Sequence, residues 1–145
     1  MITLPKNIYD QIIDHAKKDY PNEACGILGG LPGKADIFYP MQNMDKSSIS
    51  YFMDTKEQLL VIKRLRESKR EICGIFHSHV NSEAYPSQKD VRLAFYGESD
   101  PGNEKIKIFP EASYLIASLS DVNKPVLRSF RIESEKVVEE KIQIV

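Results

Sequence analysis

Three side chains in the middle of the sequence have the types and the spacing of metal ligands. His77 and His79 flank a single serine, and Asp90 follows after ten intervening residues. If the histidines lie in a strand, both imidazoles point to the same face and can share one ion. Two neutral nitrogens and one carboxylate leave a fourth position open for water, as in catalytic rather than structural zinc sites. The spacing therefore predicts a catalytic metal site.

Structural interpretations of the same residues compete with this one. The segment Ser87-Gln-Lys-Asp90 also fits a helix capping box, in which Asp90 would only accept a bond from a backbone amide. A histidine at the end of a strand is more often a hydrogen-bonded or surface residue than a ligand. The clustering favours the metal, because two of the three histidines stand at ligand spacing, shortly before a serine and an acid. Capping by Ser87 is compatible with a metal role for Asp90, and the isolated His15 is expected to be structural or exposed.

The two cysteines offer a different chemistry. Cys25 and Cys73 lie apart in apolar segments, without the spacing of a zinc knuckle or a redox pair. We expect buried, reduced thiols. A cysteine nucleophile paired with His79 or His15 is the alternative, and nothing in the surrounding sequence supports it.

The elements that must position these residues follow from hydrophobic periodicity. A first helix is predicted from Leu4-Pro5 to about Lys18, with proline tolerated in its first turn. Its apolar residues at helical spacing are Ile8, Ile12, Ile13 and Ala16. Ala24–Gly30 is predicted to form a short strand that closes on a turn, with Ile37–Tyr39 as the returning partner.

The middle of the chain supplies a second helix and the strand with the two histidines. Tyr51–Met53 is predicted as a brief strand, and Asp54 with Glu57 is typical of a capping box. The helix that it opens extends to about Ser68. The segment Glu71–His79 is rich in strand-forming residues and ends in the two histidines.

The last part of the chain is predicted to return over the end of that strand and then to close the fold. A loop through Pro86 leads to a helix from Ser87 to about Tyr96. The segment 97–110 contains glycine, proline and polar residues and is predicted to be a surface loop. The closing strands are predicted at Ala112–Ser120, Val126–Ile132 and Val137–Val145.

Helices interleaved with strand pairs indicate an α/β or α+β domain, in which helices pack against a mixed sheet. The 145 residues can bury most of the apolar surface of one core, so we expect one domain over residues 1–145. Hydrophobic residues make up 41% and charged residues 28% of the chain, which excludes disordered and fibrous compositions.

Charge and hydropathy exclude two classes of partner. The 20 basic and 21 acidic residues give a net charge of -1, so neither nucleic acid nor an anionic membrane is expected. The amino-terminal residues lack a signal-peptide pattern, and no apolar run approaches the length of a membrane span. The sequence therefore predicts a cytoplasmic protein.

Three segments together resemble the motif of a known enzyme family. Glu23 precedes the first predicted strand, Gly74-Ile-Phe-His-Ser-His79 ends the strand with the histidines, and Ala84-Tyr-Pro-Ser-Gln-Lys-Asp90 follows. This arrangement resembles the motif of the JAMM (MPN-plus, JAB1-type) zinc metallopeptidases, a glutamate followed by H-x-H, seven residues and S-x-x-D. Glu23–Gly29 and Pro110–Leu119 resemble strands of the short prokaryotic members, and the similarity covers roughly residues 2–134. It implies an MPN/JAB-like domain with a curved mixed sheet flanked by helices.

The resemblance also implies roles for five residues. His77, His79 and Asp90 would hold Zn²⁺, which lowers the pKa of a bound water from 15.7 to about 7. Glu23 would act as general base and return the proton to the leaving amine. Ser87 would donate a hydrogen bond to the oxyanion of the tetrahedral intermediate. Without the resemblance, Glu23 would be interpreted as an exposed residue before a strand.

One position departs from the family pattern. The residue after the second histidine is Val80, where the family usually has proline. This departure concerns the rigidity of the loop that follows and leaves the ligands themselves unchanged.

As a function, the resemblance implies hydrolysis of a peptide or isopeptide bond at the C-terminal diglycine (Gly-Gly) of a ubiquitin-like, β-grasp sulfur-carrier protein. The alternatives are a non-catalytic scaffold of the same fold, a general small-peptide metal hydrolase, and an iron oxygenase with two histidines and a carboxylate. The intact motif argues against the scaffold, and the ligand order, with Glu23 and Ser87, argues against the oxygenase. The segments 42–50 and 97–110 are short where larger members carry insertions that grip ubiquitin, which favours a minimal prokaryotic-type enzyme. The oligomeric state is open, and a homodimer is one option.

Overall fold

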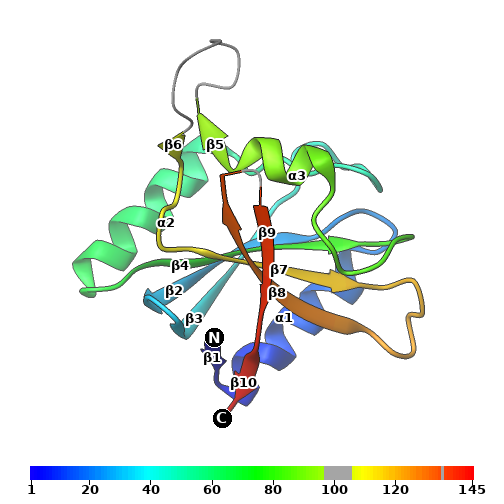
Figure 1. Ribbon diagram of the computed structural model, residues 1–145, viewed down its shortest axis with the longest axis horizontal. Coiled ribbons are helices and arrows are strands. Elements are labelled where there is room, and N and C mark those ends of the chain that lie inside the picture. Colours follow the sequence, from blue (N-terminus) through cyan, green and yellow to red (C-terminus); the bar gives the residue numbers. More distant parts are fainter. Residues whose placement is uncertain (97–105, 135) are drawn as a thin grey trace.

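The computed structural model describes residues 1–96, 106–134 and 136–145, and one strongly curved mixed sheet forms its centre (Figure 1). The strands of this sheet are β1 (Ile2–Leu4), β2 (Cys25–Leu31), β3 (Lys34–Met41), β4 (Glu71–His79), β7 (Ser113–Ser118), β8 (Val126–Glu133), β9 (Lys136–Glu140) and β10 (Ile142–Ile144). Their order is β10-β1-β3-β2-β4-β7-β8-β9. The other elements are α1 (Lys6–Asp19), α2 (Thr55–Glu67), α3 (Gln88–Leu93) and the antiparallel pair β5 (Phe95–Tyr96) and β6 (Ile106–Lys107). The predicted class, a mixed curved sheet flanked by helices, is confirmed.

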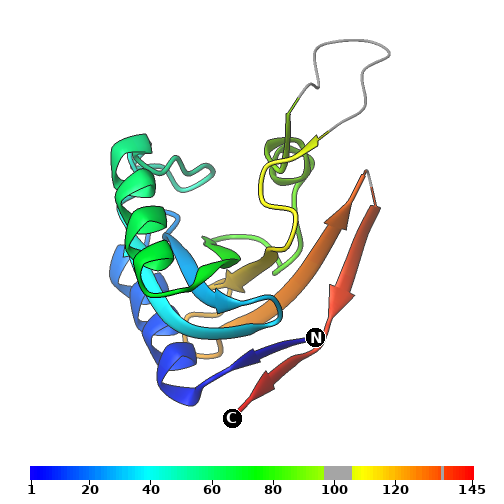
Figure 2. The same cartoon turned by 90° about the vertical axis from the view of Figure 1, so that its left-hand side faces the viewer.

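The two outermost strands of the sheet come from one continuous segment. β9 ends at Glu140 and β10 begins at Ile142, so only Lys141 separates them. Because one residue spans at most about 3.6 Å, the sheet must curl until its first and last strands meet, and Figure 2 shows this curvature. The prediction of one strand over Val137–Val145 was therefore wrong at Lys141, where the chain passes from one edge of the sheet to the other.

The first residues also differ from the prediction. Ile2–Leu4 form β1, which pairs in parallel with both β10 and β3, and α1 begins only at Lys6. Pro5 occupies the N-cap position, where a backbone N–H would have no partner within the helix, so the proline loses no helical hydrogen bond. The sequence of β1 is too short to show a strand period, and one of its two partners, β10, lies at the other end of the chain.

The central strands β2 and β4 are buried on both faces because a helix covers each face. Leu28 and Phe76 pack in the cluster of α1, whose buried side chains are the predicted Ile8, Ile12, Ile13 and Ala16. Ile27 and Ile75 pack in the cluster of α2, with Val61 and Leu65. Burial on both faces explains why these strands contain continuous apolar runs instead of an alternating pattern.

The second helix approaches the sheet very closely at one glycine. A Cβ atom on Gly29 would lie 2.3 Å from Cδ2 of Leu65, so a larger residue here would force the buried Leu65 side chain of α2 to shift. Asp54 caps the helix by accepting a bond of 3.1 Å from the backbone N–H of Lys56. The predicted second helix is thus present, and its N-cap is the predicted residue.

The helix predicted from Ser87 to Tyr96 is shorter than expected. α3 ends at Leu93, and Phe95–Tyr96 turn into β5, which pairs with β6. Of the predicted surface loop 97–110, residues 97–105 lie outside the described residues and 106–107 form β6. In the described part of the chain, no helix is long and apolar enough to cross a membrane.

Glu140 ties three strands of the curled sheet together. Its carboxylate accepts hydrogen bonds from Ser113 on β7 and from Ser129 on β8, the second at 2.9 Å, and lies 3.1 Å from the amine of Met1. Although burial acts in the opposite direction, these bonds hold the pKa of Glu140 below its usual value. The folded state therefore favours the ionised carboxylate.

We expect Glu140→Gln to lower the free energy of unfolding by about 1 to 2 kcal/mol at pH 7. Because the folded pKa lies below the unfolded value, this contribution is complete above the unfolded pKa, near 4.5, and is lost as the pH falls through the folded pKa. Urea unfolding of both proteins at pH 7 and below pH 4 measures it. Glu139→Gln, which breaks only an exposed pair with Arg128, is the matched control and should change little. A difference that stays constant with pH would contradict this role of Glu140.

Candidate metal centre and active site

The end of β4 and the start of α3 bring the three predicted ligands together. The Nε2 atoms of His77 and His79 lie 3.0 Å apart. Oδ2 of Asp90 lies 3.1 Å from the first and 3.2 Å from the second. Both histidines are buried, and Asp90 is partly buried. Three side chains from two elements thus converge on one point.

The separations of these atoms fit a tetrahedral metal site. With ligands at about 2.0 to 2.2 Å from zinc, neighbouring ligand atoms lie about 3.3 to 3.6 Å apart. The observed triangle has edges of 3.0, 3.1 and 3.2 Å, which differ from this range by only a few tenths of an ångström. The residues could therefore hold a metal ion with two nitrogen donors and one oxygen donor.

A backbone carbonyl fixes the tautomer of His79. Its Nδ1 lies 2.8 Å from the carbonyl oxygen of Glu83, which can only accept, so Nδ1 carries the proton. In the neutral ring, Nε2 of His79 is then the nitrogen without a proton and can bind a metal ion. Such a bond on the far side of the ring is the usual support of a metal-binding histidine.

His77 is oriented mainly by stacking. The ring of Tyr51 lies 4.7 Å from its ring, centroid to centroid, at an interplanar angle of 23°. Nδ1 of His77 is buried and has no hydrogen-bond partner among the described residues. Its position is thus set by packing on one side and by the ligand cluster on the other. The strand predicted over Tyr51–Met53 is absent apart from an isolated bridge between Asn43 and Met53, and no local pattern in the sequence links Tyr51 to His77.

Asp90 is both the expected cap and the expected ligand. Its Oδ2 accepts a bond of 2.9 Å from the backbone N–H of Ser87, while Oγ of Ser87 accepts one of 3.1 Å from the N–H of Asp90. Burial alone would raise the pKa of Asp90, but its close contacts with the rings of His77 and His79 and the bond from the Ser87 N–H hold it well below its usual value. The carboxylate is therefore anionic, as a metal ligand must be.

Glu23 is buried, contrary to the interpretation that its position before a strand alone would give. Only 6% of it is exposed, and it lines the same cavity as His79, Ser87 and Asp90. Burial, the largest effect, raises its pKa to about 7, with Asp90 acting in the same direction and His79 in the opposite one. A carboxyl group with this pKa can both take and return a proton near neutral pH.

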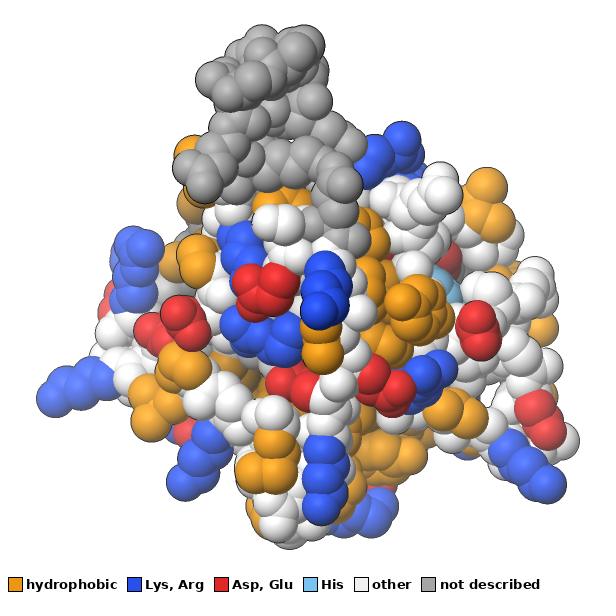
Figure 3. Space-filling view, in the orientation of Figure 1, with side chains coloured by type: hydrophobic (Ala, Val, Ile, Leu, Met, Phe, Trp, Pro, Cys, Tyr) orange, Lys and Arg blue, Asp and Glu red, His pale blue; other side chains and the backbone are white. Residues whose placement is uncertain are grey.

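The cavity beside the ligands has a volume of about 220 Å³. One wall is formed by Ser48 and Ile49, and Ile49 is 82% exposed. The space-filling view shows little histidine surface, in agreement with the burial of the two ligands (Figure 3). Ile49 could not be identified from the sequence, because it lies in a polar segment without a periodic pattern.

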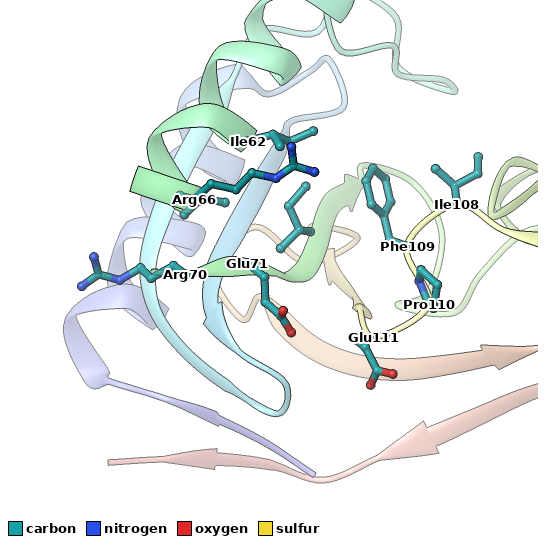
Figure 4. A pocket seen from close by; sticks show the side chains of 10 residues that line it. Ile62, Arg66, Arg70, Glu71, Ile108, Phe109, Pro110 and Glu111 are labelled. Carbon is teal, nitrogen blue, oxygen red and sulfur yellow. The ribbon is translucent and has the colours of Figure 1, made fainter. Parts of the chain in front are cut away.

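A second cavity, of about 330 Å³, lies elsewhere (Figure 4). Arg66, Glu71 and Phe109 are among the residues that line it, and Glu71 is at the opposite end of β4 from His79. Eight steps along a strand correspond to about 26 Å. This cavity is therefore separate from the metal site.

The cysteines do not support a thiol nucleophile. Cys25 and Cys73 are fully buried and free. Burial raises the pKa of both thiols to about 12, so neither forms a thiolate near neutral pH. His15, whose Nε2 lies 2.9 Å from the carbonyl oxygen of Cys25, connects α1 to β2 and is structural, as expected.

The loop after His79 is anchored without the proline that Val80 replaces. Two hydroxyl groups donate to the carbonyl oxygen of Ser82, from Ser118 at 2.6 Å and from Ser120 at 3.0 Å. Val80 is itself buried. These contacts hold the segment that contains the Glu83 carbonyl. Side-chain hydrogen bonds therefore stabilise the loop that follows His79.

Comparisons with known proteins agree with this arrangement. A family model described as prokaryotic homologs of the JAB domain matches residues 5–133. The CysO-cysteine peptidase of Mycobacterium tuberculosis is 33% identical over 147 residues, covering 100% of this chain and 92% of the relative. The desampylase of Haloferax volcanii is 26% identical over 100 residues, covering 64% and 72%. The solution structure of a protein from Desulfitobacterium hafniense has a TM-score of 0.82 at 38% identity, covering 100% of this chain and 93% of that one.

We expect the purified protein to bind about one metal ion per chain, since the site offers three ligands and one open position. His77→Ala should remove most of it, because two ligands hold a metal far more weakly than three. Elemental analysis of proteins prepared without chelator measures the content. His15→Gln changes the histidine outside the cluster and should retain the metal; unchanged metal in His77→Ala would refute the assignment.

Proposed function

The chain belongs to the family of prokaryotic homologs of the JAB domain, and from this premise we propose that it is a zinc-dependent peptidase acting on a ubiquitin-like, β-grasp sulfur-carrier protein. The bond cleaved would be the peptide or isopeptide bond after the C-terminal diglycine of that protein. The observation that carries the proposal is the convergence of His77, His79 and Asp90 at a cavity that Glu23 and Ser87 also line. Family membership and the peptidase names of the relatives confirm the expected class of enzyme, a JAMM-type peptidase.

Zinc suits the donor set of two imidazoles and one carboxylate. When held by His77, His79 and Asp90, it supplies a Lewis acid and a water of lowered pKa. The protein residues then have to move one proton and stabilise one negative charge.

Glu23 is the group that moves the proton. Its carboxylate accepts a proton from the attacking water and donates it to the nitrogen of the leaving amine. A pKa of about 7 places both protonation states within reach at neutral pH. Glu23 lines the cavity without being part of the ligand cluster, which leaves it free to do this.

Ser87 is the group that stabilises the negative charge. Its Oγ already accepts the N–H of Asp90, and the hydrogen bonds of the described residues give its hydroxyl proton no acceptor. The proton can therefore be donated to the oxyanion that forms on the substrate carbonyl. The same capping bond holds the oxygen in place.

The dimensions of the cavity favour an extended tail as substrate. About 220 Å³ is below the usual range for sites that enclose a drug-sized ligand and cannot hold a folded protein. Because glycine has no side chain, a tail that ends in two glycines can bring its carbonyl close to His79 and Asp90 without a clash. The exposed Ile49 at the wall offers apolar contact to the body that carries the tail. The name of the Mycobacterium tuberculosis relative, CysO-cysteine peptidase, supports a single amino acid as one leaving group.

Glu23→Gln should keep the zinc but reduce kcat by about 10²- to 10⁴-fold, because the amide preserves the shape and loses the basicity. Steady-state kinetics together with zinc content test this. Glu67→Gln, the same change at an exposed position on α2, should have full activity. Near-normal turnover by Glu23→Gln would mean that another group is the base.

The second expectation concerns the position of cleavage. A β-grasp sulfur carrier extended by a few residues beyond its diglycine should be cut directly after the second glycine, as measured by mass spectrometry of the products. Replacing both glycines with valine should slow cleavage strongly, since the side chains would block approach to the ligands. Equal rates for the two carriers, or cleavage elsewhere, would instead indicate a general small-peptide hydrolase.

A further inference from the structure

The residues that face the substrate depend on a buried amide behind them. We propose that Asn43 is a positioning residue, which fixes both the backbone of Glu23 and the loop that forms the cavity wall. This inference rests on the proposed function, because it assigns Asn43 a role in the reaction that Glu23 performs. Asn43 itself lines none of the cavity beside the metal ligands.

The side chain of Asn43 uses its full hydrogen-bonding capacity. Nδ2 donates to the carbonyl oxygens of Glu23 and Ser50, both at 3.0 Å. Oδ1 accepts from the backbone N–H groups of Asp45 at 3.0 Å and Phe52 at 3.1 Å. Two donors and two acceptors are all that an amide side chain offers for strong bonds. Asn43 is only 5% exposed, so losing any partner would leave a buried polar group unsatisfied.

These bonds close the segment 44–52 into a defined loop. Three of the four partners are backbone groups of this segment, and a further backbone bond of 2.8 Å joins Met44 to Phe52. The loop contains Ser48 and Ile49, which line the cavity, and Tyr51, which stacks on His77. The wall of the active site is therefore shaped by one side chain that lies outside it.

Glu23 is attached to the same network on both sides of its own backbone. Its N–H donates to the carbonyl oxygen of Ser47 at 2.8 Å, and its carbonyl oxygen accepts from Asn43. The first of these partners lies in the loop and the second is the residue that closes the loop. Movement of the loop would thus be transmitted to the base. Of the three predicted metal ligands, His79 and Asp90 are held separately by β4, α3 and the carbonyl of Glu83, and only His77 contacts the loop, through Tyr51.

Only an amide satisfies this arrangement. An aspartate at position 43 would have the same shape, but it would lose both donors and place negative charge against the carbonyl oxygens of Glu23 and Ser50. A serine would be smaller, could keep at most one of the donor bonds, and would leave space for water. Asn43→Ser is therefore the milder probe and Asn43→Asp the more severe one.

The first measurement is amide hydrogen exchange of the protein with zinc bound. In Asn43→Ser, the amides of Glu23, Asp45 and Phe52 should exchange at least about tenfold faster than in the wild type, because their acceptors are lost or loosened. Ser129→Ala is the control, since it removes a buried hydrogen bond of the sheet, to Glu140, and lies outside the cavity. It should leave the exchange of these three amides unchanged. Unchanged exchange in Asn43→Ser would overturn the proposal.

The second measurement is the split between kcat and KM, with zinc content determined on the same samples. Misplacing the base should reduce kcat of Asn43→Ser by about tenfold to a hundredfold, while zinc content stays within twofold. Ser129→Ala should keep the wild-type kcat at a temperature where both variants are folded. A kcat in Asn43→Ser equal to that of the control, despite faster exchange, would reduce Asn43 to a structural residue and overturn its positioning role.

The two measurements separate this inference from the proposed function. If the wild type cleaves no carrier protein, the proposed function fails, and the exchange data still decide whether Asn43 holds Glu23 and the loop. If Asn43→Asp does not fold, Asn43→Ser carries the test alone. Loss of zinc from Asn43→Ser would place its effect on the ligands instead of the base and would also overturn the proposal.

Discussion

The pairing of β2 with β4 is the constraint on which the candidate site depends. In this antiparallel ladder Cys25 lies opposite His77, so one step further places Ala24 opposite Ser78. Ala24 and Ser78 are joined twice, since the N–H of Ala24 donates to Oγ of Ser78 at 2.7 Å and the N–H of Ser78 donates to the carbonyl of Ala24 at 2.9 Å. Glu23, the residue before Ala24, therefore lies near the end of β4 and lines the same cavity as His79. The proposed proton acceptor, Glu23, and the proposed metal ligand, His79, are 56 positions apart in the chain and are brought together by the pairing of β2 with β4.

This constraint explains which parts of the site could be predicted from the sequence. His77, His79 and Asp90 are close in the chain, and strand alternation with a capping box suffices to bring them together. Glu23 could be assigned only through the family resemblance, because its burial depends on a strand register that is not visible locally. Asn43 could not be predicted at all, since three of its four partners are backbone groups of a loop without periodicity.

The same distinction applies to the fold. α1 and α2 were predicted within a few residues because their apolar faces repeat at helical spacing and their first turns have recognisable residues. The break at Lys141 and the short β1 escaped prediction because both are set by the closure of the sheet, in which residues 2–4 meet residues 142–144. The switch from α3 to β5 likewise depends on pairing with β6, a partner ten or more residues away. Long-range pairing, more than local preference, limits what the sequence reveals.

The shared oxygen of Asp90 links the metal site to the order of a helix. α3 has only six residues, too few to be stable by its own hydrogen bonds. Its first turn depends on the reciprocal bonds between Ser87 and Asp90, and Oδ2 of Asp90 in those bonds is the same atom that faces both histidines. The helix cap and the proposed metal site therefore share one atom. A substitution at either Ser87 or Asp90 would therefore disturb the proposed metal site and the local fold at the same time.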